Sequence, residues 1–129
     1  MPTSSPANSP PSELNPAATI DPQALEGLRE LSPDDPAFLR ELIDLFIQDV
    51  ADRFAELERA LATSDANLLT RAAHTIKGSC SNFGATELIR ISQAMELQGK
   101  AADLAAAAAT FPALRAEFAA VAEALRQFR

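Results

Sequence analysis

The sequence predicts an all-α protein, an antiparallel four-helix bundle with a short additional N-terminal helix. From Thr19 onward apolar residues recur at steps of three and four, and strand-like alternation is absent. Four long amphipathic segments follow one another with short connections, which is typical of a bundle. The chain has 129 residues, of which 47% are hydrophobic, enough for one domain with a core and too few for two. A helical dimer whose second chain completes the core is the structural alternative.

The N-terminal segment, residues 1–19, differs in composition from the rest. It holds five of the nine prolines, and Glu13 is its only charged residue. Such a segment has too little apolar surface to offset the entropy lost on ordering. We expect a flexible tail, or equally a remnant of a linker from a larger protein, and we place the bundle at 20–129.

The first helix is predicted to begin at Asp21, a suitable N-cap, with Pro22 in the first helical position. It should run to Leu31, where residues 32–36, Ser-Pro-Asp-Asp-Pro, interrupt it and supply the next start. The expected result is a short helix followed by a sharp break.

The second helix is predicted at about 37–63. Its apolar face consists of Leu39, Leu42, Ile43, Phe46, Val50, Phe54, Leu57 and Leu61. Leu45 and Ile47 fall outside this face. Because apolar residues away from the core often mark contacts, we expect both to belong to a docking surface on the second, third and fourth helices.

The third helix is predicted to begin after the N-cap Asp65 and to end near Phe83, with Gly84 in the left-handed conformation beyond it. The fourth is predicted at about 85–98, with Gly99 as its stop. Its inward residues are Leu88, Ile91 and Met95.

The C-terminal part is predicted as an alanine-rich helix at 103–109, followed by a last helix with Thr110 as its cap. Pro112 would then lie in a first turn, where proline is tolerated. The inward face of this helix reads Phe111, Leu114, Phe118, Val121, Leu125 and Phe128.

Composition restricts the functions open to the chain. A net charge of -7 and a pI near 4.6 argue against nucleic acid as a partner, because phosphate backbones are bound by clustered Lys and Arg. A single cysteine forms no internal disulfide, and neither a secretory signal nor an apolar run of membrane-spanning length is evident. We expect a soluble cytoplasmic protein without a membrane partner.

The one histidine, His74, lies on the wrong side of its helix for core packing. The apolar stripe there centres on Ile76, and at about 100° per residue the imidazole falls roughly 160° away. The residues that share its face are Asn67, Arg71, Gly78 and Ser81. We infer that the ring faces water or a partner protein.

The residues around His74 lack the groups that several other kinds of site require. One His and one Cys are too few ligands for a zinc-type metal site, so no metal is expected. Cys80 lies about 120° around the helix, which excludes a Cys–His pair within this helix. Ser79 and Ser81 lack a visible group that would orient the histidine for hydrolysis.

The neighbours of His74 form a basic and open patch on an acidic protein. Lys77, one of only two lysines, lies three residues on and within reach of a group attached to the ring. Gly78 costs the helix about 1 kcal/mol relative to Ala, which suggests that a partner approaches closely. Arg71 lies one turn before the histidine. A phosphoryl group on the imidazole fits this patch.

The stretch AHTIKGSCSNFGATEL, residues 73–88, resembles the signature of histidine-containing phosphotransfer (Hpt) domains. The similarity comprises His74, Lys77-Gly78 with a small Ser after them, the Phe-Gly-Ala turn around Gly84, and Leu88. Glu96 falls where the family commonly has Glu or Gln. The helical layout is similar over about 20–128.

The resemblance implies a carrier in which His74 exchanges a phosphoryl group with an aspartate on a receiver domain, either of a hybrid sensor kinase or of a response regulator. Lys77 would neutralise phosphate charge and Gly78 would keep the approach open. Arg71, Ser81 and Glu96 would support the site. The receiver would supply the aspartate and Mg²⁺, so we expect that this chain binds no cofactor itself. We also expect it to be a monomer.

Three other functions fit the sequence less well. The dimerisation helices of sensor kinases usually have an acidic residue directly after the histidine and a Thr-Pro soon after, whereas Thr75 follows here. The four scattered glycines form no phosphate-binding loop, so an ATP site is not expected. A helical adaptor that inhibits a kinase or regulator without carrying phosphate remains the alternative, and a phosphatase acting on an aspartyl phosphate is the third possibility.

Overall fold

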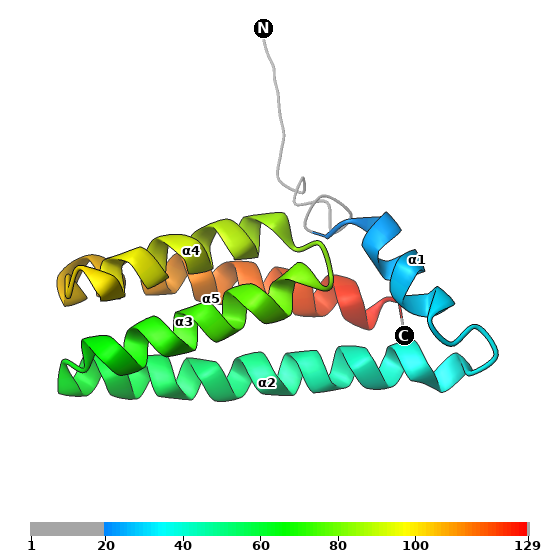
Figure 1. Cartoon of the computed structure of the whole chain (residues 1–129), viewed down its shortest axis with the longest axis horizontal. Coiled ribbons are helices and arrows are strands. Elements are labelled where there is room, and N and C mark those ends of the chain that lie inside the picture. The colour runs from blue at the N-terminus through cyan, green and yellow to red at the C-terminus, as the bar shows by residue number, and fades with distance from the viewer. Residues whose placement is uncertain (1–19, 129) are drawn as a thin grey trace, which may run out of the picture.

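The computed structural model describes residues 20–128, and these form five α-helices without a strand. The helices are α1 (Pro22–Glu30), α2 (Pro36–Thr63), α3 (Ala66–Ser81), α4 (Thr86–Lys100) and α5 (Leu104–Arg126). Helices α2 to α5 form an antiparallel bundle, and α1 lies across one end of it (Figure 1). The predicted fold class, a four-helix bundle with a short N-terminal helix, is confirmed. The predicted tail at 1–19 lies outside the described residues.

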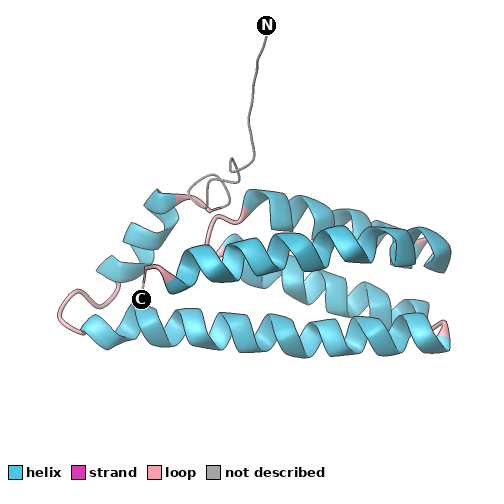
Figure 2. Ribbon diagram, turned by 180° about the vertical axis from the view of Figure 1, so that it is seen from behind, coloured by secondary structure: helices cyan, strands magenta, loops and turns pink. Residues whose placement is uncertain are grey.

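The two ends of the bundle differ. The α2–α3 and α4–α5 turns lie together at one end, whereas α1, the α3–α4 turn and the C-terminal end of α5 gather at the other (Figures 1 and 2). Helix α3 packs against both α2 and α4, most extensively against α4. The α3–α4 pair, which carries His74, is therefore the most closely packed part of the bundle.

Aspartate caps fix the predicted helix starts. The carboxylates of Asp21, Asp35 and Asp65 each accept a hydrogen bond from a backbone amide in the first turn of α1, α2 and α3. Pro22 and Pro36 follow the first two caps in the position where a missing N–H costs nothing. These local signals act within a few residues, which is why the sequence reveals them.

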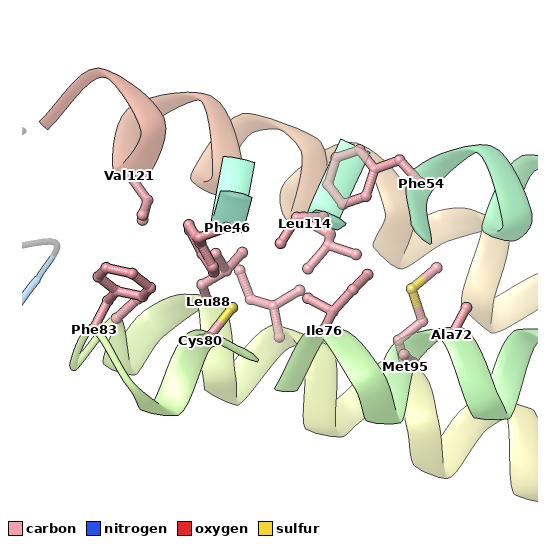
Figure 3. Close-up of a cluster of buried hydrophobic side chains, with 14 of the residues drawn as sticks. Phe46, Phe54, Ala72, Ile76, Cys80, Phe83, Leu88, Met95, Leu114 and Val121 are labelled. Atoms are coloured by element: carbon pink, nitrogen blue, oxygen red, sulfur yellow. The ribbon is translucent and has the colours of Figure 1, made fainter. Parts of the chain in front are cut away.

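All four bundle helices contribute to one hydrophobic core. Helix α3 lines it with side chains from one face, and those shown in Figure 3 are Ala72, Ile76 and Cys80, with Phe83 just beyond the helix. A chain of aromatic rings joins the helices, because Phe46 packs on Phe83 with ring centroids 4.6 Å apart and Phe54 packs on Phe118 at 5.1 Å. This core turns the opposite face of α3 toward solvent.

Two predictions about apolar residues need correction. Ile47 does not stand clear of the core but is half-buried against it. Phe128 lies just past the end of α5 and is exposed, so it does not belong to an inward face. Leu31, where the first helix was expected to end, is the C-cap of α1 and is exposed. Leu45 is 67% exposed, as its position outside the apolar stripe predicts.

Gly84 takes the left-handed conformation, with φ +61°, as predicted for the residue past α3. Its carbonyl also accepts a hydrogen bond from the amide of Asp21, 3.1 Å away. A Cβ at Gly84 would lie 2.5 Å from the Cβ of Asp21. The glycine thus serves both the turn and the docking of α1 on the bundle.

The prediction that Gly99 ends the fourth helix is wrong. Gly99 lies inside α4, and the left-handed residue beyond the helix is Ala102, with φ 56°. A Cβ at Gly99 would meet Thr70 Oγ1 and would lie 2.9 Å from Leu69 Cδ2. The glycine is required by the close approach of α3 and α4 and not by a turn.

The division of the C-terminal part into two helices is also wrong. Helix α5 is continuous, begins after the N-cap Asp103 and contains Pro112 in its interior. Thr110 does not cap a helix, because its hydroxyl donates to the Ala106 carbonyl within α5 at 3.0 Å. The alanine-rich start favours a helix strongly enough to continue through a proline, which removes one backbone hydrogen bond.

Helix α5 is long and apolar enough to cross a membrane by length and composition alone, with a mean hydropathy of 1.3 over an 18-residue window. By this measure the expectation that no apolar run reaches membrane-spanning length is wrong. The alanines raise the hydropathy, while the larger residues Phe111, Leu114 and Val121 are buried in the bundle. In the structure α5 is a bundle helix packed on α4 and α2.

Candidate functional site

His74 stands on the solvent side of α3, and its side chain is 66% exposed. Its helical neighbours Ala73 and Ile76 are fully buried and anchor that turn in the core. The other residues predicted to share its face are also exposed, namely Asn67, Arg71, Gly78 and Ser81. The predicted exposure of the imidazole is confirmed.

One side of the ring is fixed by Glu96 of α4. Nδ1 of His74 lies 2.9 Å from Oε2 of Glu96. An ionised carboxylate can only accept a hydrogen bond, so Nδ1 carries the proton and donates it. In the neutral ring Nε2 then holds the free lone pair. The contact therefore leaves Nε2 as the ring nitrogen whose lone pair is available to a partner.

The carboxylate of Glu96 is nearly buried, with 5% of its side chain exposed, and both lysines of the chain pair with it. Nζ of Lys77 lies 2.7 Å from Oε1, and Nζ of Lys100 lies 3.5 Å from Oε2. The Lys77 hydrogen bond is the main cause that lowers the pKa of Glu96, and the His74 hydrogen bond adds to it against the opposing effect of burial. Glu96 is therefore ionised at neutral pH.

Lys77 is held between two residues of α4. Besides its ion pair with Glu96, its ammonium donates to Oε1 of Gln93 at 2.7 Å. Only a quarter of the side chain is exposed. The cation thus lies beside His74 on the α3–α4 seam, with its head group aligned by two α4 side chains.

Gly78 leaves an open space one turn beyond His74. A Cβ built at this glycine would meet nothing within 4 Å, so packing inside the chain does not require glycine here. The open surface agrees with the predicted approach of a partner. At Gly99, by contrast, a Cβ would collide with neighbouring atoms, so glycine occupies the two positions for different reasons.

The remaining predicted residues lie nearby without touching the imidazole. Arg71 is exposed one turn before His74 and forms no ion pair within residues 20–128. The Ser81 hydroxyl donates to the Lys77 carbonyl at 3.1 Å, which binds it to the helix backbone. Arg71 adds positive charge to the patch, whereas Ser81 only completes the end of α3.

Sequence reasoning missed Gln93 and Lys100. Together with Glu96 they lie at steps of three and four along α4, which places them on one helical face. A polar stripe of this kind beside the apolar one was a usable signal. Its link to His74 depends on the packing of α4 against α3, which a single sequence does not display.

Cys80 plays no part in the site. It is fully buried, and burial raises the pKa of its thiol to about 12. A protonated, enclosed thiol is no nucleophile, so its position supports the expected packing role.

Comparison with known proteins identifies the family. The sequence profile of the Hpt domain matches residues 41–124. The chain belongs to the Hpt domain family. This match covers most of α2 and all of α3 and α4, including His74 and the α4 residues that hold it.

Two relatives extend this result. The crystal structure of histidine-containing phosphotransfer protein B (HptB) from Pseudomonas aeruginosa PAO1 is similar, with a TM-score of 0.79 and 32% sequence identity over 86% of this chain and 94% of that chain. The phosphorelay intermediate protein YPD1 of Candida albicans is 22% identical over 76 residues. That alignment covers 59% of this chain and 41% of the relative's length.

Proposed function

We propose that this Hpt domain carries a phosphoryl group on Nε2 of His74 and exchanges it with an aspartate of a receiver domain, in a hybrid sensor kinase or a response regulator. The observation that carries the proposal is the contact of Nδ1 with Glu96, because it fixes the ring and turns Nε2 to solvent. Family membership and the likeness to HptB support it.

The proposed reaction is a phosphoryl transfer without a resident acid or base. Nε2 attacks the phosphorus of the partner's aspartyl phosphate, the N–P bond forms, and the carboxylate leaves with the electrons of the broken O–P bond. The proton on Nδ1 stays in its hydrogen bond to Glu96. In the reverse direction a receiver carboxylate attacks phosphorus and the neutral imidazole leaves.

Each neighbour has a limited task in this scheme. Lys77 offsets phosphate charge from beside the ring, and Arg71 adds positive charge from the exposed face. Gly78 leaves room for the incoming receiver, since in-line transfer requires partner atoms close to Nε2. Such a site positions the phosphoryl group and neutralises its charge. This suits a carrier whose catalytic groups are supplied by another protein.

We infer a phosphoryl carrier without an ATP site or bound cofactor, with Mg²⁺ held by the receiver. A monomer is supported by the core that α2 to α5 close among themselves. We propose the cytoplasm as its compartment, in line with its membership of the Hpt domain family.

Transfer from a ³²P-labelled receiver tests the proposal. Mixing should move label to this chain in an acid-labile, alkali-stable form, and His74→Gln should abolish it while the circular dichroism spectrum stays helical. Label on the Gln variant would refute the assignment to His74. Receiver binding with no transfer to the native chain would favour the adaptor, and loss of receiver phosphate without a labelled chain would favour the phosphatase.

A further inference from the structure

Glu96 is paired with more positive charge than it can neutralise. Its carboxylate lies against the ammonium groups of both Lys77 and Lys100, and it also accepts the hydrogen bond from Nδ1 of His74. Because the imidazole is neutral when Nε2 holds its lone pair, two cations face one anion, and one positive charge is in surplus. Whichever lysine is held less firmly is available to a new anion beside the ring.

Lys77 is held firmly. Its ammonium lies 2.7 Å from Oε1 of Glu96 and donates to Oε1 of Gln93 at 2.7 Å. Only 25% of its side chain is exposed, and the carboxylate that it neutralises is 5% exposed. Moving this cation away would break two short contacts and would leave a nearly buried carboxylate without its main partner, which is costly.

Lys100 is held loosely. Its ammonium lies 3.5 Å from Oε2 of Glu96, whereas a charge-assisted hydrogen bond measures about 2.7–2.9 Å. Its side chain is 61% exposed, and among residues 20–128 this contact is its only ion pair. Exposed pairs of this kind add little to stability. Lys100 can therefore leave Glu96 at small cost, while Lys77 and His74 continue to satisfy the carboxylate.

The position of Lys100 places its ammonium within reach of the imidazole. The ammonium contacts the same oxygen, Oε2 of Glu96, that accepts the hydrogen bond from Nδ1 of His74. Helices α3 and α4 run antiparallel (Figure 1), and Gly99 packs against Thr70, one turn before His74 on α3. Side chains on a helix lean toward its N-terminus, so those of Lys100 and His74 lean toward each other. The flexible four-carbon stem of a lysine lets the ammonium turn from Oε2 toward a group on Nε2.

We propose that Lys100 is the cation that binds the phosphoryl group on Nε2 of His74, while Lys77 stays on Glu96 and contributes its charge from there. The inference rests on the proposed function, which supplies the phosphoryl group. That group brings negative charge and three acceptor oxygens, so the ammonium exchanges a long contact with a carboxylate for short hydrogen bonds to phosphate. The phosphorylated histidine is thereby stabilised relative to the receiver's aspartyl phosphate, and Lys100 determines how far transfer proceeds.

Removal of the charge tests the effect on transfer. Lys100→Met keeps an unbranched side chain without the cation, and Lys100→Arg restores the charge. Each full chain is mixed with a ³²P-labelled receiver domain of the source organism, and the equilibrium ratio of labelled chain to labelled receiver is measured. We expect Lys100→Met to lower this ratio roughly threefold or more and Lys100→Arg to return it close to the native value. The urea midpoints of the unphosphorylated chains should be similar.

Arg90→Met is the matched control. Arg90 is an exposed cation of the same helix, paired with Glu87, and it lies ten residues before Lys100, a rise of about 15 Å. Both Met variants change the net charge of the chain by the same amount. The control should give the native ratio, and an equal fall in both variants would assign the effect to overall charge and overturn the inference.

A second measurement follows the ammonium groups themselves. Because the chain has only two lysines, ¹⁵N-lysine labelling gives two ammonium signals in NMR spectra, and Lys100→Arg assigns them. Phosphoramidate, a small donor that needs no receiver, phosphorylates the chain when Nε2 attacks phosphorus and ammonia leaves. We expect the Lys100 signal to shift and its protons to exchange more slowly with water, while the Lys77 signal changes little. A shift confined to Lys77 would overturn the inference.

The outcomes separate the inference from the proposed function. A native chain that neither phosphoramidate nor any receiver labels would overturn both. A labelled native chain whose transfer ratio is unchanged in Lys100→Met would overturn the role of Lys100 alone. A lowered ratio that Lys100→Arg fails to restore would likewise overturn it, because the loss would then follow from the shape of the side chain and not from its charge.

Discussion

The ammonium of Lys77 and the carboxylate of Glu96 form an ion pair 2.7 Å long across the α3–α4 seam, and the carboxylate is nearly buried. This pair joins the electrostatics of the site to the stability of the fold. The cation that would neutralise phosphate charge under the proposed function is, in the unphosphorylated chain, also the main partner of a buried anion.

Lys77→Ala should therefore have two effects. Transfer should slow because phosphate charge is less well neutralised, and the folded state should lose stability because a buried carboxylate keeps only His74 and the exposed Lys100 as partners. The measurements are rapid-quench transfer and urea denaturation. Lys100→Ala is the control, and its stability effect should stay within about 1 kcal/mol, as for other exposed pairs. An unchanged transfer rate in Lys77→Ala would remove the electrostatic role.

Gly78→Ala should stabilise the protein and impair it at the same time. The added methyl meets open space, so the helix gains about 1 kcal/mol relative to glycine. Under the proposed function the same methyl would occupy the surface that a receiver approaches, so transfer should slow while labelling by the small phosphoryl donor phosphoramidate continues. Thermal denaturation and transfer kinetics check the two effects. A stabilised variant with native transfer would show that the open space serves no partner.

Gly99→Ala should instead destabilise the protein. Its methyl would collide with Thr70 and Leu69, so stability should fall by about 1–3 kcal/mol, as for other overpacked sites. Denaturation midpoints of the two alanine variants should move in opposite directions from the native value. A stabilised Gly99→Ala would mean that α3 and α4 separate more easily than their packing indicates.

The contrast between these glycines shows what the sequence can predict. Local signals were sufficient for the helix starts at Asp21, Asp35 and Asp65 and for the left-handed Gly84, because their causes lie within a few residues. Gly99 was misjudged because its cause is Thr70, 29 positions away in the chain. Thr110 and Pro112 were misjudged because the helical preference of the preceding alanines outweighed a single proline.

The same limit applies to the site. The exposure of His74 and the nearness of Lys77 follow from helical periodicity on one segment. The pairing of Glu96 with both lysines, and the choice of Nε2 that it implies, require α4 to be packed on α3 in a particular register. Family resemblance placed Glu96 near the histidine, whereas Gln93 and Lys100 became visible only in three dimensions.

Glu96 should also make stability depend on pH. Its folded-state pKa is lowered, chiefly by the Lys77 hydrogen bond, so the carboxylate stabilises the fold above its unfolded pKa of about 4.3. That contribution is lost as pH falls through the folded pKa. The stability difference between the native chain and Glu96→Gln should therefore shrink between pH 6 and pH 3 in urea titrations. A constant difference over this range would contradict the lowered pKa.

The thiol of Cys80 should report on the opening of the bundle. It is fully buried in the last turn of α3, and burial raises its pKa to about 12, so both access and thiolate formation are suppressed in the folded chain. At pH 8 we expect alkylation by iodoacetamide to be at least a hundredfold slower than in urea. The rate should rise in Gly99→Ala, which loosens the α3–α4 packing, and fall in Gly78→Ala. Fast alkylation of the native chain would show that α3 separates from the core without global unfolding, and the imidazole on its other face would then lack a fixed support.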